Sequence, residues 1–238
     1  MLDPVLWMGG WASNLACWRG TFENLYPGRE HIFLDAHAVL SEPGLLPLAA
    51  ASLPPGGTLV AWSLGSLLLH RALAEDGFRP ACRLVSACPI FDFCREGGPW
   101  PRAALSRMAR RLPKGREAVL SEFWALVKGN SSVTPDQDQA WLAQSRNHPL
   151  ESLLEGLEAL GGLRIERDLL PPQARRHFLA SARDPLSPPA REAFPGPGWI
   201  GYPQGHLPFL DYPDLLRPLL GDKGGKAGNG GRARAAAP

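Results

Sequence analysis

A buried-strand pattern that turns into a helix at a single serine is the feature that most limits how this chain can fold. Residues 58–62 (TLVAW) are apolar and β-branched like a buried strand, and residues 64–73 (LGSLLLHRAL) have a continuous apolar helical face. Ser63 alone separates them, so the chain must turn sharply there, which the small neighbours Ala61 and Gly65 permit. Such a turn lifts the serine hydroxyl out of the sheet and points the first helical amides toward the group that it attacks.

Short apolar segments recur along the first part of the chain at spacings typical of βαβ units. Because their connections are long enough to cross over, the sheet should be parallel, with helices on both faces. Strand-like segments return near the end of the chain and are followed by a last helix. The predicted strands are 4–8, 31–36, 58–62, 83–87, 177–182 and 198–203, and the last helix is near 212–220.

The segment between the two groups of strands has a helical pattern throughout, as expected for a lid over an active site. The final residues (GDKGGKAGNGGRARAAAP) have no apolar face to bury and should be disordered. We therefore predict an α/β fold with a mostly parallel sheet. Its core comprises residues 1–88 and 169–220, the helical lid 89–168 and the disordered tail 221–238.

Composition excludes several classes of protein. The net charge of +2 in 238 residues does not indicate a nucleic-acid-binding protein. No apolar run approaches the length of a membrane span. The N-terminus (MLDPVLWMGG) lacks the basic region of a signal peptide, so we expect a cytoplasmic protein. The cysteines, Cys17, Cys82, Cys88 and Cys94, form no CxxC pair or metal-ligand spacing, so we expect structural thiols and no metal or cofactor.

Three predicted strands are followed by residues that could form a catalytic triad. Ser63 follows one strand, Asp184 the strand at 177–182, and His206 the last strand, in the chain order Ser, Asp, His typical of α/β-hydrolases. Singly, the serine could be an N-cap, the Asp-Pro pair a turn and the histidine structural. The coincidence of all three at strand ends favours a triad.

Other acids are alternatives to Asp184. Asp35 and Asp168 remain possible, although neither lies at the end of the strand before the histidine segment. Asp211 is too close to His206 in sequence to be its usual partner.

Two backbone amides are expected to stabilise the negatively charged oxygen of the reaction. One belongs to Leu64, directly after the nucleophile, and the other to Trp11 in the turn after the first strand. Gly9 and Gly10 allow this turn to approach the reacting centre.

Several segments together resemble the pimeloyl-acyl-carrier-protein methyl ester carboxylesterases of biotin biosynthesis, members of the α/β-hydrolase superfamily. The resemblance covers nearly the whole fold. Its motifs are the Gly-Trp turn GGWASNLACW with Asn14 and Trp18, the elbow AWSLGSL, the lid segments SEFWALV and LLEGLEALGGLRIERDL, and the histidine loop GHLPFLDYPDLL. Two departures are Ala61, where the family's elbow has glycine, and Gly9, where the family has histidine.

The resemblance implies a reaction and a pocket. Ser63 would attack the ester carbonyl of a methylated pimeloyl chain and release methanol, and water activated by His206 would hydrolyse the acyl-enzyme. Trp11, Trp62 and Phe123 would line an apolar tunnel for the chain, although core packing would also explain these aromatic residues. The same triad would also suit a broad short-chain esterase or an acyl thioesterase, and a non-catalytic binding protein is a further alternative.

The resemblance also implies an acyl carrier protein as partner, which the family binds through lid arginines. Two of those positions are Ala118 and Glu122 in this chain. A nearby basic cluster could attract an acidic carrier protein, and a solvated helix face would explain it equally well. Its members are Arg102, Arg107, Arg110, Arg111, Lys114 and Arg116.

Overall fold

A parallel sheet forms the centre of the molecule. The computed structural model describes residues 2–75, 78–166, 170, 176–188 and 198–221. Within them six strands pair in the order β2-β1-β3-β4-β5-β6, and every pair is parallel. The strands are β1 (Val5–Met8), β2 (His31–Leu34), β3 (Thr58–Trp62), β4 (Arg83–Ala87), β5 (Arg176–Ala180) and β6 (Trp199–Gly201).

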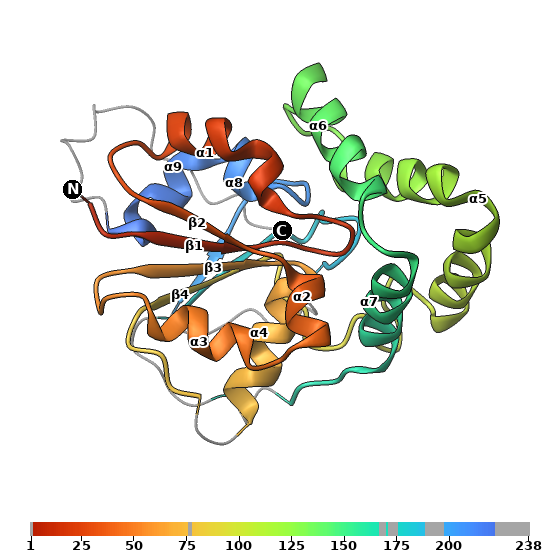
Figure 1. Cartoon of the computed structure of the whole chain (residues 1–238), viewed down its shortest axis with the longest axis horizontal. Helices are drawn as coiled ribbons and strands as arrows, with labels where there is room; N and C mark the ends of the chain where they lie inside the picture. Colours follow the sequence, from red (N-terminus) through yellow and green to blue (C-terminus); the bar gives the residue numbers. More distant parts are fainter. Residues whose placement is uncertain (1, 76–77, 167–169, 171–175, 189–197, 222–238) are drawn as a thin grey trace, which may run out of the picture.

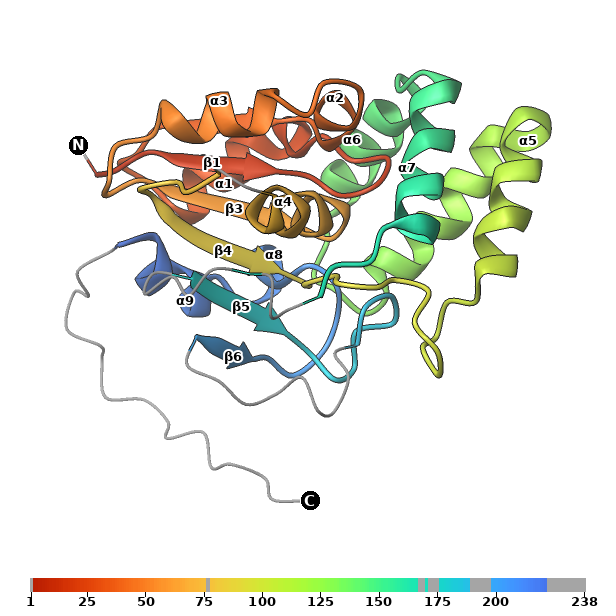
Figure 2. The ribbon, with the colours of Figure 1, turned by 90° about the horizontal axis from the view of Figure 1, so that it is seen from below.

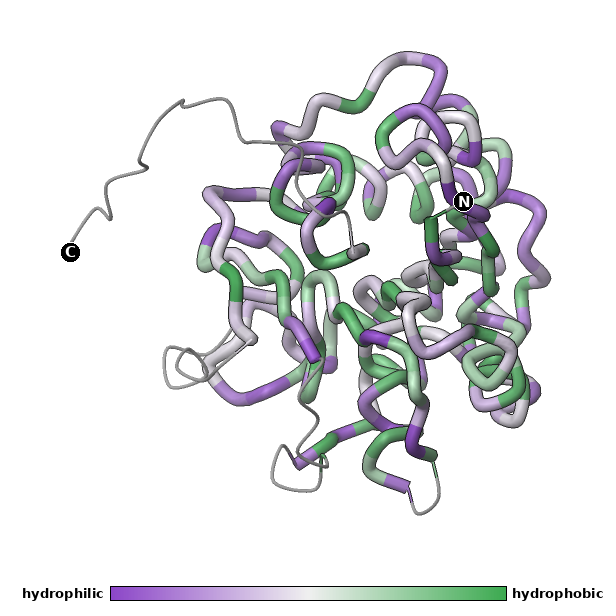
Figure 3. Tube along the Cα trace, turned by 90° about the vertical axis from the view of Figure 1, so that its left-hand side faces the viewer, coloured by the Kyte–Doolittle hydropathy of each residue, from purple (hydrophilic) through white to green (hydrophobic). Residues whose placement is uncertain are grey.

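Helices cover both faces of this sheet, which explains why β1 and β3 are buried at every position. Figure 1 shows one group of helices above the sheet and another below it. The first group is α1 (Arg19–Leu25), α8 (Pro208–Asp211) and α9 (Pro213–Leu216), and the second is α2 (Ala36–Ser41), α3 (Leu45–Ala51) and α4 (Leu64–Ala74). Short 3-10 segments, η1 (Leu15–Trp18) and η4 (Arg217–Leu220), complete the first group. Hydrophilic and hydrophobic residues alternate along the helices, as one-sided burial requires (Figure 3).

Three helices lie beyond the carboxyl ends of the strands (Figures 1 and 2). They are α5 (Arg102–Lys128), α6 (Pro135–Arg146) and α7 (Leu150–Gly162). Gly115, at φ −160° and ψ 56°, interrupts α5, so its two halves can follow different directions. The Thr134 side chain and the Gln137 amide close a capping box at the start of α6. We refer to α5–α7 as the lid helices.

The strands at 58–62 and 83–87 are confirmed residue for residue. The strand predicted at 31–36 ends earlier, because the Asp35 carboxylate accepts a hydrogen bond from the His37 amide and caps α2. His37 is therefore helical, where its sequence context favours a loop.

Two other differences concern helices. The last helix is divided into short turns, because Pro213 and Pro218 each remove a backbone donor. Helical structure was expected from residue 89, but the helix begins only at Arg102. Between these positions, Asp92 forms an isolated antiparallel bridge with Arg164. Asp168 and the tail 222–238 lie outside the described residues.

No helix in the described part of the chain is both long enough and apolar enough to cross a bilayer.

Candidate active site

Ser63 lies in a strained turn between β3 and α4. Its backbone, at φ 56° and ψ −118°, occupies a region that residues with side chains rarely adopt. The Ser63 amide donates to the Ala87 carbonyl at 3.1 Å, and the Ser63 carbonyl accepts from the Ser66 amide at 2.9 Å. A Cβ atom added at Gly65 would lie 2.5 Å from the Gly9 carbonyl oxygen, so only glycine fits this close approach. The turn thus matches the sharp elbow expected at Ser63 from the sequence.

The turn after β1 lies directly against this elbow. Strand register aligns Met8 with Ala61, so the residues that follow β1 and β3 emerge together at one edge of the sheet. A Cβ atom built on Gly10 would lie 3.0 Å from the Ser63 Cβ. Neither the Trp11 nor the Leu64 amide donates a hydrogen bond to another described residue. Both amides are therefore free to stabilise an anionic oxygen.

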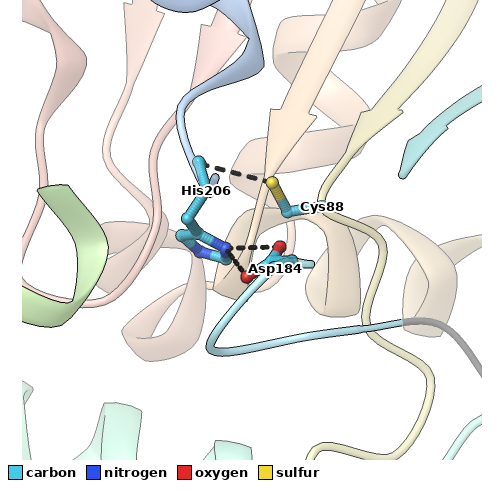
Figure 4. Close-up of side chains that lie close together, drawn as sticks. All are labelled: Cys88, Asp184 and His206. Atoms are coloured by element: carbon cyan, nitrogen blue, oxygen red, sulfur yellow. Dashed lines mark hydrogen bonds and ion pairs between the residues drawn. The ribbon is translucent and has the colours of Figure 1, made fainter. Parts of the chain in front are cut away.

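Asp184 and His206 form a buried hydrogen-bonded pair at the same edge (Figure 4). The His206 Nδ1 atom lies 2.8 Å from Oδ1 and 2.7 Å from Oδ2 of Asp184. The carboxylate also accepts the amides of Leu186 and Ser187, at 2.9 and 3.1 Å. Burial acts to raise the pKa of Asp184, but the charge of His206 and these hydrogen bonds hold that pKa below its usual value. Asp184 is therefore held as a carboxylate.

The other ring nitrogen of His206 has no partner among the described residues. Its Nε2 atom is buried and makes no hydrogen bond with any of them, Ser63 included. In the neutral tautomer that donates from Nδ1 to the Asp184 carboxylate, Nε2 carries a lone pair. In that tautomer the ring can act as a general base.

The other acids considered from the sequence have different roles. The Asp35 carboxylate caps α2 and lies 3.8 Å from the His148 Nδ1 atom. An oxygen of Asp211 accepts the Ser132 amide at 2.9 Å. Neither forms an ion pair or hydrogen bond with His206 among the described residues.

Cys88 is a site residue that our sequence reasoning did not find. It follows β4, and its thiol lies 3.1 Å from the Tyr202 hydroxyl and 3.3 Å from the His206 carbonyl oxygen (Figure 4). Its position at a strand end was the available signal, since the ends of neighbouring parallel strands meet at one edge.

The Cys88, Asp184 and His206 ligand atoms lie within 4.8 Å of one another, a spacing that suits a metal ion. However, burial and the Asp184 charge raise the pKa of the Cys88 thiol well above its usual value, whereas metal binding needs the thiolate. Asp184 and the His206 Nδ1 atom are already paired with each other. The donor set therefore fits a hydrogen-bonded pair beside a neutral thiol better than a metal centre.

The three aromatic residues expected in the pocket divide into two groups. The Trp11 and Phe123 rings meet edge to face with centroids 4.7 Å apart, so lid helix α5 touches the turn after β1. The Trp62 indole instead donates to the His206 carbonyl at 2.8 Å, and its ring packs on His206 and Phe209. Trp62 therefore supports the histidine loop.

The basic cluster lies on α5. Arg111 forms a two-fold hydrogen-bonded ion pair with Glu122, both bonds 2.6 Å long, and these two side chains are largely exposed. Arg116 differs, because its Nε and Nη2 atoms are shielded and have no hydrogen-bond partner among the described residues. The remaining members, Arg102, Arg107, Arg110 and Lys114, are exposed.

Solved structures place this architecture in a known fold class. An esterase (EaEST) from Exiguobacterium antarcticum matches with a TM-score of 0.73 and 17% identity, over 92% of each chain. The esterase RhEst1 from Rhodococcus sp. ECU1013 matches with a TM-score of 0.67 and 18% identity, over 94% of this chain and 92% of that one. MGS-M2, an α/β-hydrolase enzyme from a deep-sea metagenome library, matches with a TM-score of 0.63 and 15% identity, over 92% of this chain and 88% of that one.

The chain therefore has the α/β-hydrolase fold, which confirms the fold class predicted from the sequence. No family model and no curated protein matches its sequence.

Proposed function

We propose that this protein is a serine carboxylesterase with Ser63 as nucleophile, His206 as general base and Asp184 as the residue that orients His206. The observation that carries the proposal is the environment of His206, whose Nδ1 atom pairs with a buried carboxylate and whose Nε2 atom is buried with no hydrogen-bond partner among the described residues. Ser63 supports it, because its strained backbone is the geometry of a nucleophile elbow.

The proposed reaction proceeds through an acyl-enzyme. The Ser63 Oγ atom attacks the ester carbonyl carbon while its proton moves to the His206 Nε2 atom. The amides of Trp11 and Leu64 donate hydrogen bonds to the resulting oxyanion. When the carbon–oxygen ester bond breaks, His206 returns the proton to the leaving alcohol. Water then attacks the acyl-enzyme, gives a proton to His206 and releases the acid, and His206 returns that proton to Ser63.

The substrate that we propose is the methyl ester of a pimeloyl group on an acyl carrier protein, with methanol as the leaving group. The sequence motifs support this choice, in particular the Gly-Trp turn and the segments around Phe123 and His206. The contact between Trp11 and Phe123 would place an apolar wall beside the scissile ester.

The exposed cations of α5 support an acidic carrier protein as partner, because opposite charge speeds association. Glu122 opposes this attraction locally, since its ion pair with Arg111 cancels one positive charge. We therefore assign the contact to the first half of α5, around Arg107 and Arg110.

A comparison of wild type with Ser63→Ala tests the reaction. Both proteins are assayed on pimeloyl-carrier-protein methyl ester and on a short-chain p-nitrophenyl ester. With the carrier-bound substrate, cleavage of the methyl ester and cleavage of the thioester to the carrier protein are measured separately. We expect wild type to cleave both oxygen esters, with a preference for the carrier-bound one, and Ser63→Ala to be inactive. A preference for the thioester would indicate a thioesterase, and activity confined to the p-nitrophenyl ester a broad esterase. Equal inertness of both proteins would indicate a binding protein.

The partner is tested by Arg107→Glu/Arg110→Glu. We expect about a tenfold lower kcat/KM for the carrier-bound ester, because reversed charges repel the acidic partner. The p-nitrophenyl ester is the control, since its hydrolysis needs no carrier protein and should be unchanged. An equal loss on both substrates, or no loss on either, would contradict the assignment.

A further inference from the structure

Three hydrogen bonds that involve side chains help to fix the turn that contains the proposed oxyanion donor Trp11. The Trp11 indole donates to the Leu153 carbonyl of lid helix α7 at 2.8 Å. The Trp11 carbonyl accepts the Ser13 hydroxyl at 3.3 Å, and the Ala12 amide donates to the His37 Nε2 atom at 2.9 Å. The peptide that follows the donor is thus held at its oxygen and at its nitrogen.

His37 links this turn to two helices by hydrogen bonds. The residue belongs to α2, and its Nδ1 atom lies 2.9 Å from the Ser152 carbonyl of α7. Because a carbonyl can only accept, Nδ1 must carry the ring proton. Nε2 is therefore the acceptor for the Ala12 amide, and the two partners together define one neutral tautomer.

The backbone at Ala12 needs this support. Its φ of 55° lies in the left-handed region, which costs a residue with a side chain about 1 kcal/mol or more. Ala12 is fully buried, so its amide would lose a hydrogen bond entirely if His37 did not accept it. The hydrogen bond to His37 thus satisfies the Ala12 amide in this strained turn.

The groups around His37 keep it neutral. The His148 ring lies 4.5 Å away, and His148 is itself contacted by the Asp35 carboxylate and the Gln144 amide. Burial and the neighbouring His148 lower the pKa of His37 to about 4, although Asp35 and the Ser152 carbonyl act in the opposite direction. Burial lowers the pKa of His148, and the charge of Arg116 adds to this effect, whereas the Asp35 carboxylate acts in the opposite direction.

We propose that His37 is a positioning residue for the reaction, which holds the Trp11–Ala12 peptide so that the Trp11 amide faces the developing oxyanion. This inference rests on the proposed serine esterase function. It adds to that function a link between catalysis and the lid helices, because the same imidazole ring binds the turn that contains Trp11 and Ala12 and also binds α7.

Two substitutions separate the two hydrogen bonds of His37. In His37→Gln the side-chain oxygen can occupy the place of Nε2 and accept the Ala12 amide, while the bond to Ser152 is lost. In His37→Asn the side-chain amide can occupy the place of Nδ1 and donate to Ser152, while the Ala12 amide loses its partner. The pair is matched in polarity, and each variant removes one hydrogen bond.

The experiment measures kcat and KM on a p-nitrophenyl ester and hydrogen exchange of the Ala12 amide. We expect His37→Asn to lower kcat about tenfold or more with KM within threefold of wild type, because an oxyanion donor acts mainly in the transition state. We expect His37→Gln to stay within about threefold in kcat. The Ala12 amide should exchange faster in His37→Asn and remain protected in His37→Gln.

Two results would overturn the inference. One is wild-type kcat together with wild-type protection of Ala12 in His37→Asn. The other is an equal loss of activity and of thermal stability in both variants, which would show a purely structural role. If wild type itself were inert but the exchange pattern were as expected, the hydrogen bond from Ala12 to His37 would be upheld and the serine esterase proposal would fail.

Discussion

The His206 Nδ1 atom lies within 2.8 Å of both carboxylate oxygens of Asp184, and both side chains are fully shielded from solvent. A buried carboxylate is stable only when it is well paired, and here the imidazole and two backbone amides provide the pairing. The arrangement fixes one tautomer of the histidine. It also provides a favourable partner for the positive charge that the histidine would acquire in the proposed reaction.

Asp184→Asn tests this relationship. The neutral amide cannot stabilise an imidazolium and can force the wrong tautomer, so we expect kcat to fall about 10³- to 10⁴-fold. Ser187→Ala is the control, since it removes a hydroxyl that bonds to the Asp184 carboxylate at 3.0 Å and to the Cys88 carbonyl at 3.5 Å but leaves the carboxylate and its backbone donors in place. Steady-state kinetics on a p-nitrophenyl ester measures both. An Asp184→Asn variant with more than a tenth of wild-type kcat would rule out the assigned role.

Ser63 should limit stability because its backbone is strained. Ser63→Gly and Ser63→Ala both remove the hydroxyl, but only glycine adopts φ 56° and ψ −118° without strain. We expect Ser63→Gly to be more stable than Ser63→Ala by about 1 kcal/mol in urea unfolding. The reverse order would show that the elbow stores no strain.

The packing of lid helix α7 on the turn after β1, which contains Trp11, depends on Gly156. A Cβ atom at this position would lie 2.5 Å from Trp11 Cδ1 and 2.9 Å from His37 Cε1, so the helix could not keep its place. We expect Gly156→Ala to lower the free energy of unfolding by about 1–3 kcal/mol and to lower kcat. Gly162 at the end of the same helix has open space around it, so Gly162→Ala should be neutral or stabilising. Similar urea curves for the two variants would contradict this prediction.

The pH dependence of stability follows from the buried histidines. Burial lowers the pKa of His31, His37 and His148, and for His37 the value is about 4 against 6.5 for an exposed histidine. The unfolded chain therefore binds more protons between these two values, and the free energy of unfolding must fall as pH drops from 6.5 toward 4. His37 alone accounts for about 3 kcal/mol of this fall.

Urea unfolding at several pH values between 4.5 and 8 measures this effect. The His37→Gln variant lacks one titrating group, so its stability should fall less steeply over the same interval. Parallel curves for wild type and variant would show that His37 is not held neutral in the folded protein.

The sequence predicted the central strands and the serine elbow because both depend on local patterns. A buried parallel strand needs an uninterrupted apolar run, and the elbow needs small residues beside the serine, as in residues 58–65. Asp184 and His206 were also accessible to sequence reasoning, since each follows a strand and parallel strands end at one edge of the sheet.

The sequence did not indicate Cys88 or His37 as site residues. Cys88 reads as one more small apolar residue after a strand, and only its contacts with Tyr202 and the His206 carbonyl distinguish it. The strand predicted at 31–36 overlaps the start of α2, so the beginning of this helix was missed. The Asp35 cap depends on a single side-chain hydrogen bond, which the sequence pattern does not indicate. His37 follows this predicted strand directly, so its place in a helix was not predicted.

The sequence by itself determined the parallel sheet and the types of residue at the strand ends, because apolar periodicity and strand-end position are properties of short segments. The tertiary structure alone decided which partners the ring nitrogens of His206 and His37 face, since Asp184 and the Ser152 carbonyl are distant in sequence from these rings. It also decided that lid helix α7 contacts the turn after β1, because the Trp11 indole and the Leu153 carbonyl come together only in the folded chain. Hydrogen bonds of this kind depend on distances of about 3 Å between remote residues, which no local pattern specifies.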